Sequence, residues 1–235
     1  VAAAGADLGI GFDGDGDRIG IIDGKGRQVP GDLLTAFLAK DVAARHPGAP
    51  ILLDVKSSEA ALQLVESVGA AAQIWKTGHS HMKKRMKELE APLAGEMSGH
   101  IFIADDYLGF DDAIYAAVRV ITQMVKGGQS ITEFMDSLPE QHATPELRID
   151  CPDTVKFDSM EKIRAHVLSG HDAADVNSID GVRVRSGDGW WLIRASNTEA
   201  ALVARAEAAD RTALDRLLGD IETTLAAAGL DWKRP

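Results

Sequence analysis

Cysteine, basic residues and long apolar runs are scarce in this sequence of 235 residues. Its one cysteine, Cys151, cannot form an intrachain disulfide, which suits a reducing compartment such as the cytoplasm. Lysine and arginine number 25 against 36 aspartates and glutamates, so the formal net charge is −11. That balance argues against nucleic-acid and anionic-membrane partners, because phosphate-rich surfaces need a positive field. No apolar run approaches the roughly 18 residues that a membrane-spanning helix needs.

What the sequence does contain is the composition of a folded protein, with 45% hydrophobic and 26% charged residues. Up to about residue 140, short apolar strands alternate with helices, which predicts an α/β layer with a mixed, partly parallel sheet. After residue 141, four strand-like runs cluster with two helices, which predicts an α+β domain. We therefore place a domain boundary near Gln141.

Three helices in the first part carry local signals. Asp32 is expected to cap a helix that begins at Gly31, and Ser58 to cap the next one. A third helix is expected over Asp111–Lys126, and it carries four apolar residues on one face, namely Ile114, Ala117, Val118 and Ile121.

An acidic loop lies between two strand-like runs, and it reads Asp13-Gly14-Asp15-Gly16-Asp17-Arg18. Carboxylates that alternate with glycine can converge on one hard cation, since glycine permits tight turns. The planar guanidinium of Arg18 suits a phosphoryl group beside such a cation. A solvated acidic turn is the simpler alternative, although closely spaced aspartates repel when no cation separates them. An EF-hand is excluded, because that motif needs glycine at Arg18 and glutamate at Gly24.

A second polar loop, residues 75–80, follows an apolar strand and contains Lys76 and His79. Lys56 lies at the end of the neighbouring strand. In α/β sheets, ligands bind beyond the carboxyl ends of the strands, so these groups could hold phosphate or transfer protons. The alternative is a solvent-facing histidine beside a basic helix.

A third loop, residues 95–100, stands directly before a strand and offers Glu96, Ser98 and His100 between glycines. A carboxylate, a hydroxyl and an imidazole supply the acceptors and donors that recognition of a hydroxyl-rich sugar requires. Taken without its context, this loop is equally compatible with an ordinary polar turn.

A fourth loop connects two apolar strands and contains Arg194, Ser196, Asn197 and Thr198. One guanidinium, two hydroxyls, one amide and the backbone N–H groups make a compact cradle for an oxyanion. The alternative is a polar hairpin loop, because serine, asparagine and threonine are common turn residues. The arginine favours phosphate.

The order of these loops resembles that of the α-D-phosphohexomutases, and within them the bacterial phosphomannomutase/phosphoglucomutase branch. The wording Gly-Glu-Met-Ser-Gly-His and Ser-Asn-Thr is similar to that branch rather than to the phosphoglucosamine branch. Ala200 departs from the family's usual proline. The matching stretches extend from residue 11 to residue 198, and they are Gly11–Arg18, Trp75–Ser80, Gly95–His100, Gly109–Asp112 and Arg194–Thr198.

Family members move a phosphoryl group between O6 and O1 of a hexose through a 1,6-bisphosphate. The resemblance therefore implies mannose and glucose 1- and 6-phosphates as partners, with either sugar open, and glucose 1,6-bisphosphate as an activator. It implies Mg²⁺ held by Asp13, Asp15 and Asp17, with Arg18 beside the transferred group. Lys56 and His79 would act near the reacting hydroxyl. The remaining implied substrate-binding residues are Lys76, Glu96, Ser98, His100, Arg194, Ser196, Asn197 and Thr198.

The resemblance also implies a domain organisation. Residues 1–23 correspond to the end of a second α/β domain, residues 24–140 to a third domain of α/β type, and residues 141–235 to a fourth domain of α+β type. The family carries its catalytic serine in an N-terminal domain, within a Thr-Ala-Ser-His-Asn-Pro-like loop, and this sequence has no such string. We therefore expect a fragment that is inactive alone. Its expected partner is the N-terminal domain, which could be carried by a separate chain.

Two other functions stay open from the residues. A haloacid-dehalogenase-like phosphatase or phosphomutase would use Asp13 as its nucleophile, with Asp111 and Asp112 as further metal ligands. That class usually has threonine or valine where Gly16 stands, and it leaves the third and fourth loops unexplained. The second alternative is a phosphosugar-binding remnant without catalysis.

Overall fold

The computed structural model describes residues 1–234 and divides the chain into two compact units. The first is Val1–Pro139 and the second begins at Glu140, close to the boundary expected from the sequence. The prediction of an α/β fold with mixed sheets and a C-terminal α+β part is confirmed. The finer division at residue 23 stays a prediction. None of the helices within residues 1–234 is long and apolar enough to span a membrane.

The chain opens with a short 3₁₀ turn, Ala2–Ala4, and a three-stranded antiparallel sheet. Its strands are β1 (Leu8–Phe12), β2 (Ile19–Asp23) and β3 (Gln28–Val29). Phe12 stands opposite Ile19 in the register, so the acidic residues 13–18 form the loop of the β1–β2 hairpin.

The second sheet of the first unit has the strand order β5-β4-β6-β7. Its strands are β4 (Pro50–Asp54), β5 (Ala71–Trp75), β6 (Leu93–Gly95) and β7 (Ile101–Ile103). Strand β4 runs parallel to β5 and β6, whereas β7 is antiparallel to β6. The carboxyl ends of the three parallel strands therefore lie at one edge, where the second and third polar loops begin.

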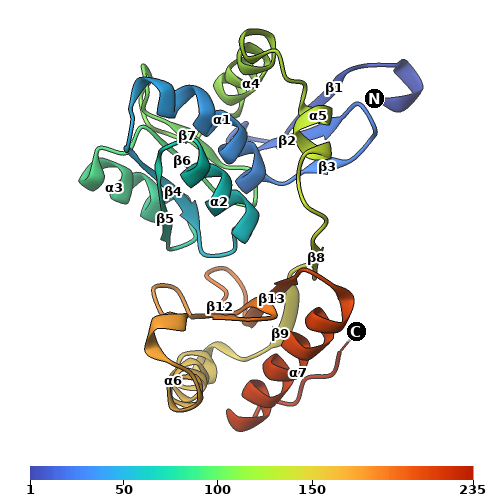
Figure 1. Cartoon of the computed structure of the whole chain (residues 1–235). Helices are drawn as coiled ribbons and strands as arrows, with labels where there is room; N and C mark the ends of the chain where they lie inside the picture. Colours follow the sequence, from blue (N-terminus) through green and yellow to red (C-terminus); the bar gives the residue numbers. More distant parts are fainter. Residues whose placement is uncertain (235) are drawn as a thin grey trace. The chain divides into compact units, whose positions relative to one another are not determined.

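Helices cover both faces of this sheet, and they are α1 (Gly31–Arg45), α2 (Glu59–Ser67), α3 (His79–Leu89) and α4 (Ala113–Gly127). The short helix α5 (Ile131–Asp136) lies instead beside the antiparallel sheet, where Thr132 Oγ1 accepts a hydrogen bond of 2.9 Å from Gly24 N. Side chains alternate along β4, so Leu53 packs with α1, α2 and α4, whereas Leu52 packs on the other face with Met82 and Met86 of α3. The apolar strands thus form the middle layer of the unit (Figure 1).

One of the two predicted helix caps is confirmed and the other is wrong. The hydroxyl of Ser58 accepts a hydrogen bond of 3.1 Å from Ala61 N and caps α2. Helix α1 instead begins after Pro30, whose ring presets the backbone for a helix start. Asp32 lies inside the first turn, and its buried carboxylate accepts a hydrogen bond of 2.7 Å from the backbone amide of Ser58.

Helix α4 forms in the predicted segment, but it buries a different face from the one that the apolar spacing marks. Its buried residues include Ala113, Ala116 and Val120, and they pack in the core of the first unit. Of the four apolar residues singled out in the sequence, Ala117 is buried and the other three are exposed. Both faces of this helix are apolar, so the periodicity could not identify the inner one.

The second unit contains antiparallel strands in the order β10-β11-β12-β13-β8, with β9 also paired to β13. Helices α6 (Asp153–Gly170) and α7 (Arg211–Ala227) and the 3₁₀ turn Ala173–Asp175 complete it. Trp191 packs in the core with side chains of both helices. Trp190 lies on the opposite face of its strand, and its ring centroid is 3.8 Å from the guanidinium carbon of Arg183. The strands are β8 (His142–Ala143), β9 (Leu147–Asp150), β10 (Val176–Asn177), β11 (Val182–Ser186), β12 (Gly189–Ala195) and β13 (Ala201–Ala208).

Candidate active site

The β1–β2 hairpin gathers three carboxylates. Asp13, Asp15 and Asp17 offer oxygens that all lie within 4.8 Å of one another. Arg18 Nε donates a hydrogen bond of 2.6 Å to Asp13 Oδ2, and this bond lowers the pKa of Asp13 to about 2. Three oxygen donors on a tight glycine-containing loop fit a hard divalent cation. The chemistry of this loop therefore suits Mg²⁺.

The loop between β6 and β7 joins its three polar residues to each other. Glu96 Oε2 lies 3.1 Å from His100 Nδ1 and accepts a hydrogen bond of 3.2 Å from Ser98 Oγ. The other carboxylate oxygen of Glu96 accepts a hydrogen bond of 2.7 Å from Gly78 N, at the start of α3. The buried carboxylate of Glu96 thus holds the loop at residues 96–100 together and joins it to the start of α3.

Electrostatics favours the charged forms of this pair. Burial raises the pKa of Glu96, but the hydrogen bonds from His100 and Gly78 outweigh it, and the net pKa is lowered. Burial lowers the pKa of His100, but the hydrogen bond with Glu96 and the charges of Asp17 and Asp111 outweigh it, so the net pKa is raised. The contact therefore favours the carboxylate form of Glu96 and the imidazolium form of His100.

The acidic hairpin and the loop at residues 96–100 touch each other. His100 Nε2 lies 3.4 Å from Asp17 Oδ2, and Ile19 N donates a hydrogen bond of 3.0 Å to Gly99 O. Gly99 has φ +99°, and a Cβ at this position would lie only 2.5 Å from Ile19 O. Glycine is therefore required for this close approach, and it brings two predicted groups of site residues onto one surface.

Asp111 connects this surface to α3, a role that the sequence did not reveal. It accepts a hydrogen bond of 2.8 Å from Lys83 Nζ and lies 3.9 Å from His79 Nδ1. One donor atom each of Asp17, His100 and Asp111 also lies within 4.8 Å of the others. The phosphohexomutase resemblance assigned no role to the acidic pair that ends Gly109–Asp112, and only the haloacid-dehalogenase alternative named Asp111, as a metal ligand.

Asp54 is a second residue that sequence reasoning missed. It ends β4 and is fully buried, and its Oδ1 accepts hydrogen bonds from Ser57 Oγ (2.8 Å) and Met97 N (3.1 Å). Its Oδ2 accepts one of 3.0 Å from Thr77 Oγ1. Burial raises the pKa of Asp54, against the lowering effect of the nearby Lys56. The Asp54 carboxylate thus connects the loops that follow three parallel strands. The sequence feature that could have revealed this role is an acidic residue at the end of an apolar strand.

The lysines and the histidine of the second loop occupy different environments. Lys56 is buried, with its Nζ 3.9 Å from Asp54 Oδ2. Lys76 is exposed at the end of β5, and His79 is exposed at the start of α3. The rings of His79 and His100 are stacked, with 6.2 Å between their centroids. His79 therefore adjoins the cluster of His100, Asp17 and Asp111, and Lys56 adjoins Asp54.

In the second unit, Arg194 is the last residue but one of β12, and it is buried. Its Nε donates a hydrogen bond of 3.0 Å to Asp180 Oδ2, whereas its Nη2 is buried with no hydrogen-bond partner among residues 1–234. The hydroxyl of Ser196 accepts bonds from the backbone amides of Thr198 (3.4 Å) and Glu199 (3.1 Å). The loop is therefore held in a tight turn beside a guanidinium that has donor capacity left for an anion.

Lys156 of α6 holds this loop by hydrogen bonds to its backbone, a role that the sequence did not indicate. Its Nζ donates hydrogen bonds to the carbonyl oxygens of Ser196 (3.0 Å) and Glu199 (2.9 Å) and lies 2.6 Å from Asp153 Oδ1. The side chain is almost completely buried although it is charged. Such burial of a lysine requires strong partners, and here the partners are the loop's own carbonyls.

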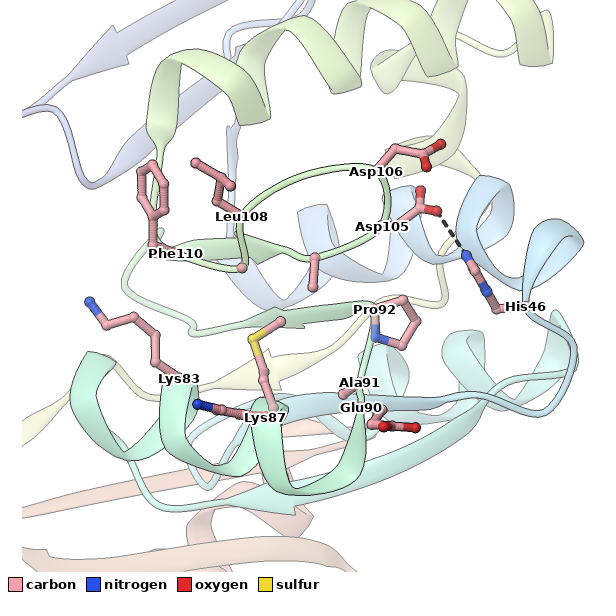
Figure 2. A pocket seen from close by; sticks show the side chains of 13 residues that line it. His46, Lys83, Lys87, Glu90, Ala91, Pro92, Asp105, Asp106, Leu108 and Phe110 are labelled. Atoms are coloured by element: carbon pink, nitrogen blue, oxygen red, sulfur yellow. Dashed lines mark hydrogen bonds and ion pairs between the residues drawn. The ribbon is translucent and has the colours of Figure 1, made fainter.

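A separate groove of about 940 Å³ lies between α3 and the segment that follows β7 (Figure 2). Figure 2 shows Lys83 and Lys87 on the α3 side, and Asp105, bonded to His46 at 2.8 Å, on the other. None of the site residues predicted from the sequence lines this groove. Lys83, which bonds to Asp111, does line it, so the groove adjoins the cluster of Asp17, His100 and Asp111.

Two family models match the sequence. The model "Phosphoglucomutase/phosphomannomutase, alpha/beta/alpha domain III" matches residues 30–142, and the model of the C-terminal domain of the same proteins matches residues 146–224. This chain belongs to the phosphoglucomutase/phosphomannomutase family. The domain III model includes the loops at residues 75–80 and 95–100, the C-terminal model includes the Arg194 loop, and the acidic hairpin precedes both.

Relatives within the family support the same assignment over the whole chain. The phosphomannomutase/phosphoglucomutase of Pseudomonas putida is 44% identical over 225 residues, which cover 96% of this chain and 48% of that protein. The structure of a phosphoglucomutase/phosphomannomutase family protein from Burkholderia thailandensis has a TM-score of 0.88 and 37% identity, covering 98% of this chain and 49% of that one. The chain thus spans about half the length of these relatives.

A more distant phosphohexomutase shares the fold. The Aspergillus fumigatus N-acetylphosphoglucosamine mutase, solved in complex with GlcNAc-6P and magnesium, has a TM-score of 0.64 and 17% identity, covering 94% of this chain and 48% of that one. The expected membership in the phosphohexomutases is therefore confirmed, and the haloacid-dehalogenase alternative finds no support among these comparisons.

Proposed function

We propose that this chain forms the metal-, sugar- and phosphate-binding half of a phosphohexomutase that interconverts the 6-phosphates and 1-phosphates of mannose and glucose. The observation that carries the proposal is the contact between the acidic hairpin and the loop at residues 96–100, where His100 lies between Glu96 and Asp17. A metal-binding loop beside a hydroxyl-binding loop is what transfer of a phosphoryl group to a sugar hydroxyl requires. The 44% identity to the Pseudomonas putida enzyme supports the substrate class.

The hairpin would hold Mg²⁺ through Asp13, Asp15 and Asp17. A bound Mg²⁺ neutralises charge on the phosphoryl oxygens as the group is transferred. The low pKa of Asp13 keeps this ligand ionised, and Arg18 supplies a second positive charge on the same loop. The complex of the Aspergillus fumigatus enzyme with GlcNAc-6P and magnesium supports this use of the metal.

The sugar itself would be oriented by hydrogen bonds from the loop at residues 96–100. Glu96 accepts from sugar hydroxyls and Ser98 can donate or accept, while His100 holds the carboxylate in place through their 3.1 Å contact. Lys56 and His79 would stand near the reacting hydroxyl to stabilise charge and transfer its proton, and Lys76 would bind substrate at the end of β5.

The phosphate that does not react would be held by Arg194, Ser196, Asn197 and Thr198. The buried Nη2 of Arg194 has no hydrogen-bond partner among residues 1–234, and an unmade hydrogen bond of this kind is costly. A phosphate oxygen would satisfy it with a charge-assisted bond. The phosphoryl donor would be a phosphoserine on the half of the enzyme that this chain does not span, with glucose 1,6-bisphosphate as the activator.

The proposal is tested by complementation. The 235-residue chain is co-expressed with the N-terminal half of the Pseudomonas putida enzyme, and conversion of glucose 1-phosphate to glucose 6-phosphate is measured with Mg²⁺ and glucose 1,6-bisphosphate. We expect turnover from the pair and none from the 235-residue chain alone. In the pair, Asp15→Asn should lower kcat by about 100-fold or more, because it removes a charged metal ligand.

The matched control is Asp158→Asn, which changes an exposed aspartate of α6 and should leave the rate unchanged. Equal rates for the Asp15 and Asp158 variants would refute the metal assignment. Folded but inactive pairs would refute the mutase assignment. As an independent readout, calorimetry on the chain alone should detect glucose 6-phosphate binding that Arg194→Lys weakens, because lysine cannot reproduce the guanidinium fork.

A further inference from the structure

The groove between α3 and the segment after β7 has no part in the function proposed above (Figure 2). Its volume of about 940 Å³ lies at the upper end of the range found for ligand sites. Three buried residues, Met86, Ala91 and Pro92, contribute to its apolar lining. Two exposed apolar side chains adjoin them, Phe110 (38% exposed) and Leu108 (77% exposed). A groove of this size with a partly apolar lining is typical of a site for an organic ligand.

Two lysines give the α3 wall of the groove a positive charge. Lys83 and Lys87 are four residues apart, so they lie on one face of the helix. Figure 2 shows both on the α3 side of the groove, with Phe110 and Leu108 on the opposite side. Lys83 bonds to Asp111 and keeps 35% of its side chain exposed, whereas Lys87 forms no ion pair within residues 1–234. Two ammonium groups one helical turn apart can bind the same diphosphate.

Two carboxylates line the groove farther along α3. Glu90 comes seven residues after Lys83, about 10 Å along the helix, and Figure 2 shows it and Asp106 toward the end where His46 lies. Glu90 has φ 52° and Asp106 has φ 56°, and within residues 1–234 they are the two residues other than glycine with positive φ. Backbone of this kind favours glycine, and side chains held in it are concentrated at functional sites. Neither carboxylate forms an ion pair within the described residues, so both can accept hydrogen bonds from a ligand.

We propose that this groove is a binding site for a nucleoside diphosphate. Such a ligand has three parts that match the three kinds of lining: the diphosphate matches the lysine pair, the flat base matches the apolar side chains, and the ribose hydroxyls match the two carboxylates. Phe110 stacks on the base, and its own ring is already held by the ring of Tyr107, with 5.5 Å between the centroids.

Other phosphates fit this lining less well. A hexose phosphate has no flat apolar ring to place on Phe110, and inorganic phosphate leaves the apolar lining unused. The proposal does not depend on the mutase reaction. The groove nevertheless adjoins the candidate active site, because Lys83 also bonds to Asp111, which lies 3.9 Å from His79.

Calorimetry of the 235-residue chain tests the proposal, with ADP and GDP as the probes and EDTA present to keep the acidic hairpin free of metal. We expect at least one of the two nucleotides to bind at least about tenfold more tightly than pyrophosphate, which has no base to stack. Lys87→Ala should weaken that binding by about tenfold, because a charge-assisted contact is lost. The matched control is Lys84→Ala, which changes an exposed lysine of α3 outside the groove and should leave binding unchanged. Phe110→Leu keeps an apolar side chain but removes the ring, and it should weaken binding by about fivefold.

No binding of either nucleotide, or pyrophosphate binding of equal strength, would overturn the proposal. So would equal weakening by Lys84→Ala and Lys87→Ala. Loss of nucleotide binding in Arg194→Lys would also overturn it, because the nucleotide would then occupy the loop of the second unit. The Tm of each variant is measured in parallel, and if Phe110→Leu fails to fold, the comparison of the two exposed lysines decides. Nucleotide binding by a chain that gives no turnover with the N-terminal half would support the groove and refute only the mutase proposal.

Discussion

Gly99 is the residue on which the contact between the two loops of the first unit depends, and Gly99→Ala is the sharpest perturbation of it. The new methyl group would lie 2.5 Å from Ile19 O, at least 0.5 Å closer than the 3.0 Å that real Cβ atoms keep. The neighbouring atoms are backbone, so no side-chain rotation relieves the contact. The loop must move away from β2, or the backbone must leave φ +99°.

The cost follows from two contributions. An alanine held at such a φ costs about 1–3 kcal/mol. Separation of the loop from β2 also breaks the 3.0 Å hydrogen bond from Ile19 N to Gly99 O, which is worth about 1 kcal/mol. The sum is roughly 2–4 kcal/mol, and for a chain of this size it corresponds to a fall in Tm of roughly 4–16 °C.

Differential scanning calorimetry of the 235-residue chain measures this fall. The matched control is Gly11→Ala in β1, where a Cβ would meet nothing within 4 Å and φ is not in the left-handed region. We expect the control to change Tm by no more than a degree or two. If Gly99→Ala melted together with the control, the close approach of Gly99 to Ile19 would not be a constraint, and the reasoning about the joined loops would fail.

Three further predictions concern ionisation and loop anchoring. In metal-free protein the Asp13 carboxyl should titrate by NMR with a pKa of about 2, and Arg18→Gln should return this pKa toward 3.8. The stabilisation that this pair contributes is therefore complete above pH 3.8 and is lost as pH falls through about 2. The His100 ring should titrate with a pKa above 6.5, and Glu96→Gln should lower that pKa. The stabilisation from the charged His100 ring is therefore complete below pH 6.5 and is lost as pH rises through the raised pKa of the folded protein. Lys156→Met should weaken glucose 6-phosphate binding to the chain by about tenfold in calorimetry, because two loop carbonyls lose their donor.

Each of these has a control and a contrary outcome. An Asp13 titration that Arg18→Gln leaves unchanged would contradict the hydrogen bond as the cause. A His100 titration at or below 6.5 would contradict the described ion pair. Lys162→Met changes an exposed lysine of the same helix as Lys156, and equal binding by the two variants would contradict the anchoring role.

The sequence could predict the features that depend on residues close to one another along the chain. The apolar runs on either side of residues 13–18 determine the hairpin, so the convergence of its aspartates followed from spacing alone. Ser58 caps α2 because the hydroxyl and the amide it accepts from are three residues apart. The loops after β5 and β6 were found because polar residues followed apolar strands.

The remaining features depend on contacts between distant parts of the chain. Asp54 and Met97 are 43 residues apart, and Lys156 and Ser196 are 40 residues apart, so no local pattern connects them. The prediction of Asp32 as a cap was wrong because its partner, the amide of Ser58, belongs to the start of another helix. The inner face of α4 was undetermined for a related reason, since only the packing of its alanines against the core selects it.

The charges of the hairpin lead to one more expectation, which concerns the effect of a divalent cation on the binding of an anionic substrate. Three aspartates and Arg18 give the metal-free hairpin a formal charge of −2, and a divalent cation brings it to zero. A phosphate is therefore repelled from the hairpin until the cation is bound, whereas Arg194 retains an unpartnered donor among the described residues with or without metal. Calorimetry should then show that Mg²⁺ strengthens hexose bisphosphate binding to the chain, and that Asp15→Asn removes this effect but leaves metal-free binding intact. Metal-independent affinity in the unsubstituted chain would refute the electrostatic argument.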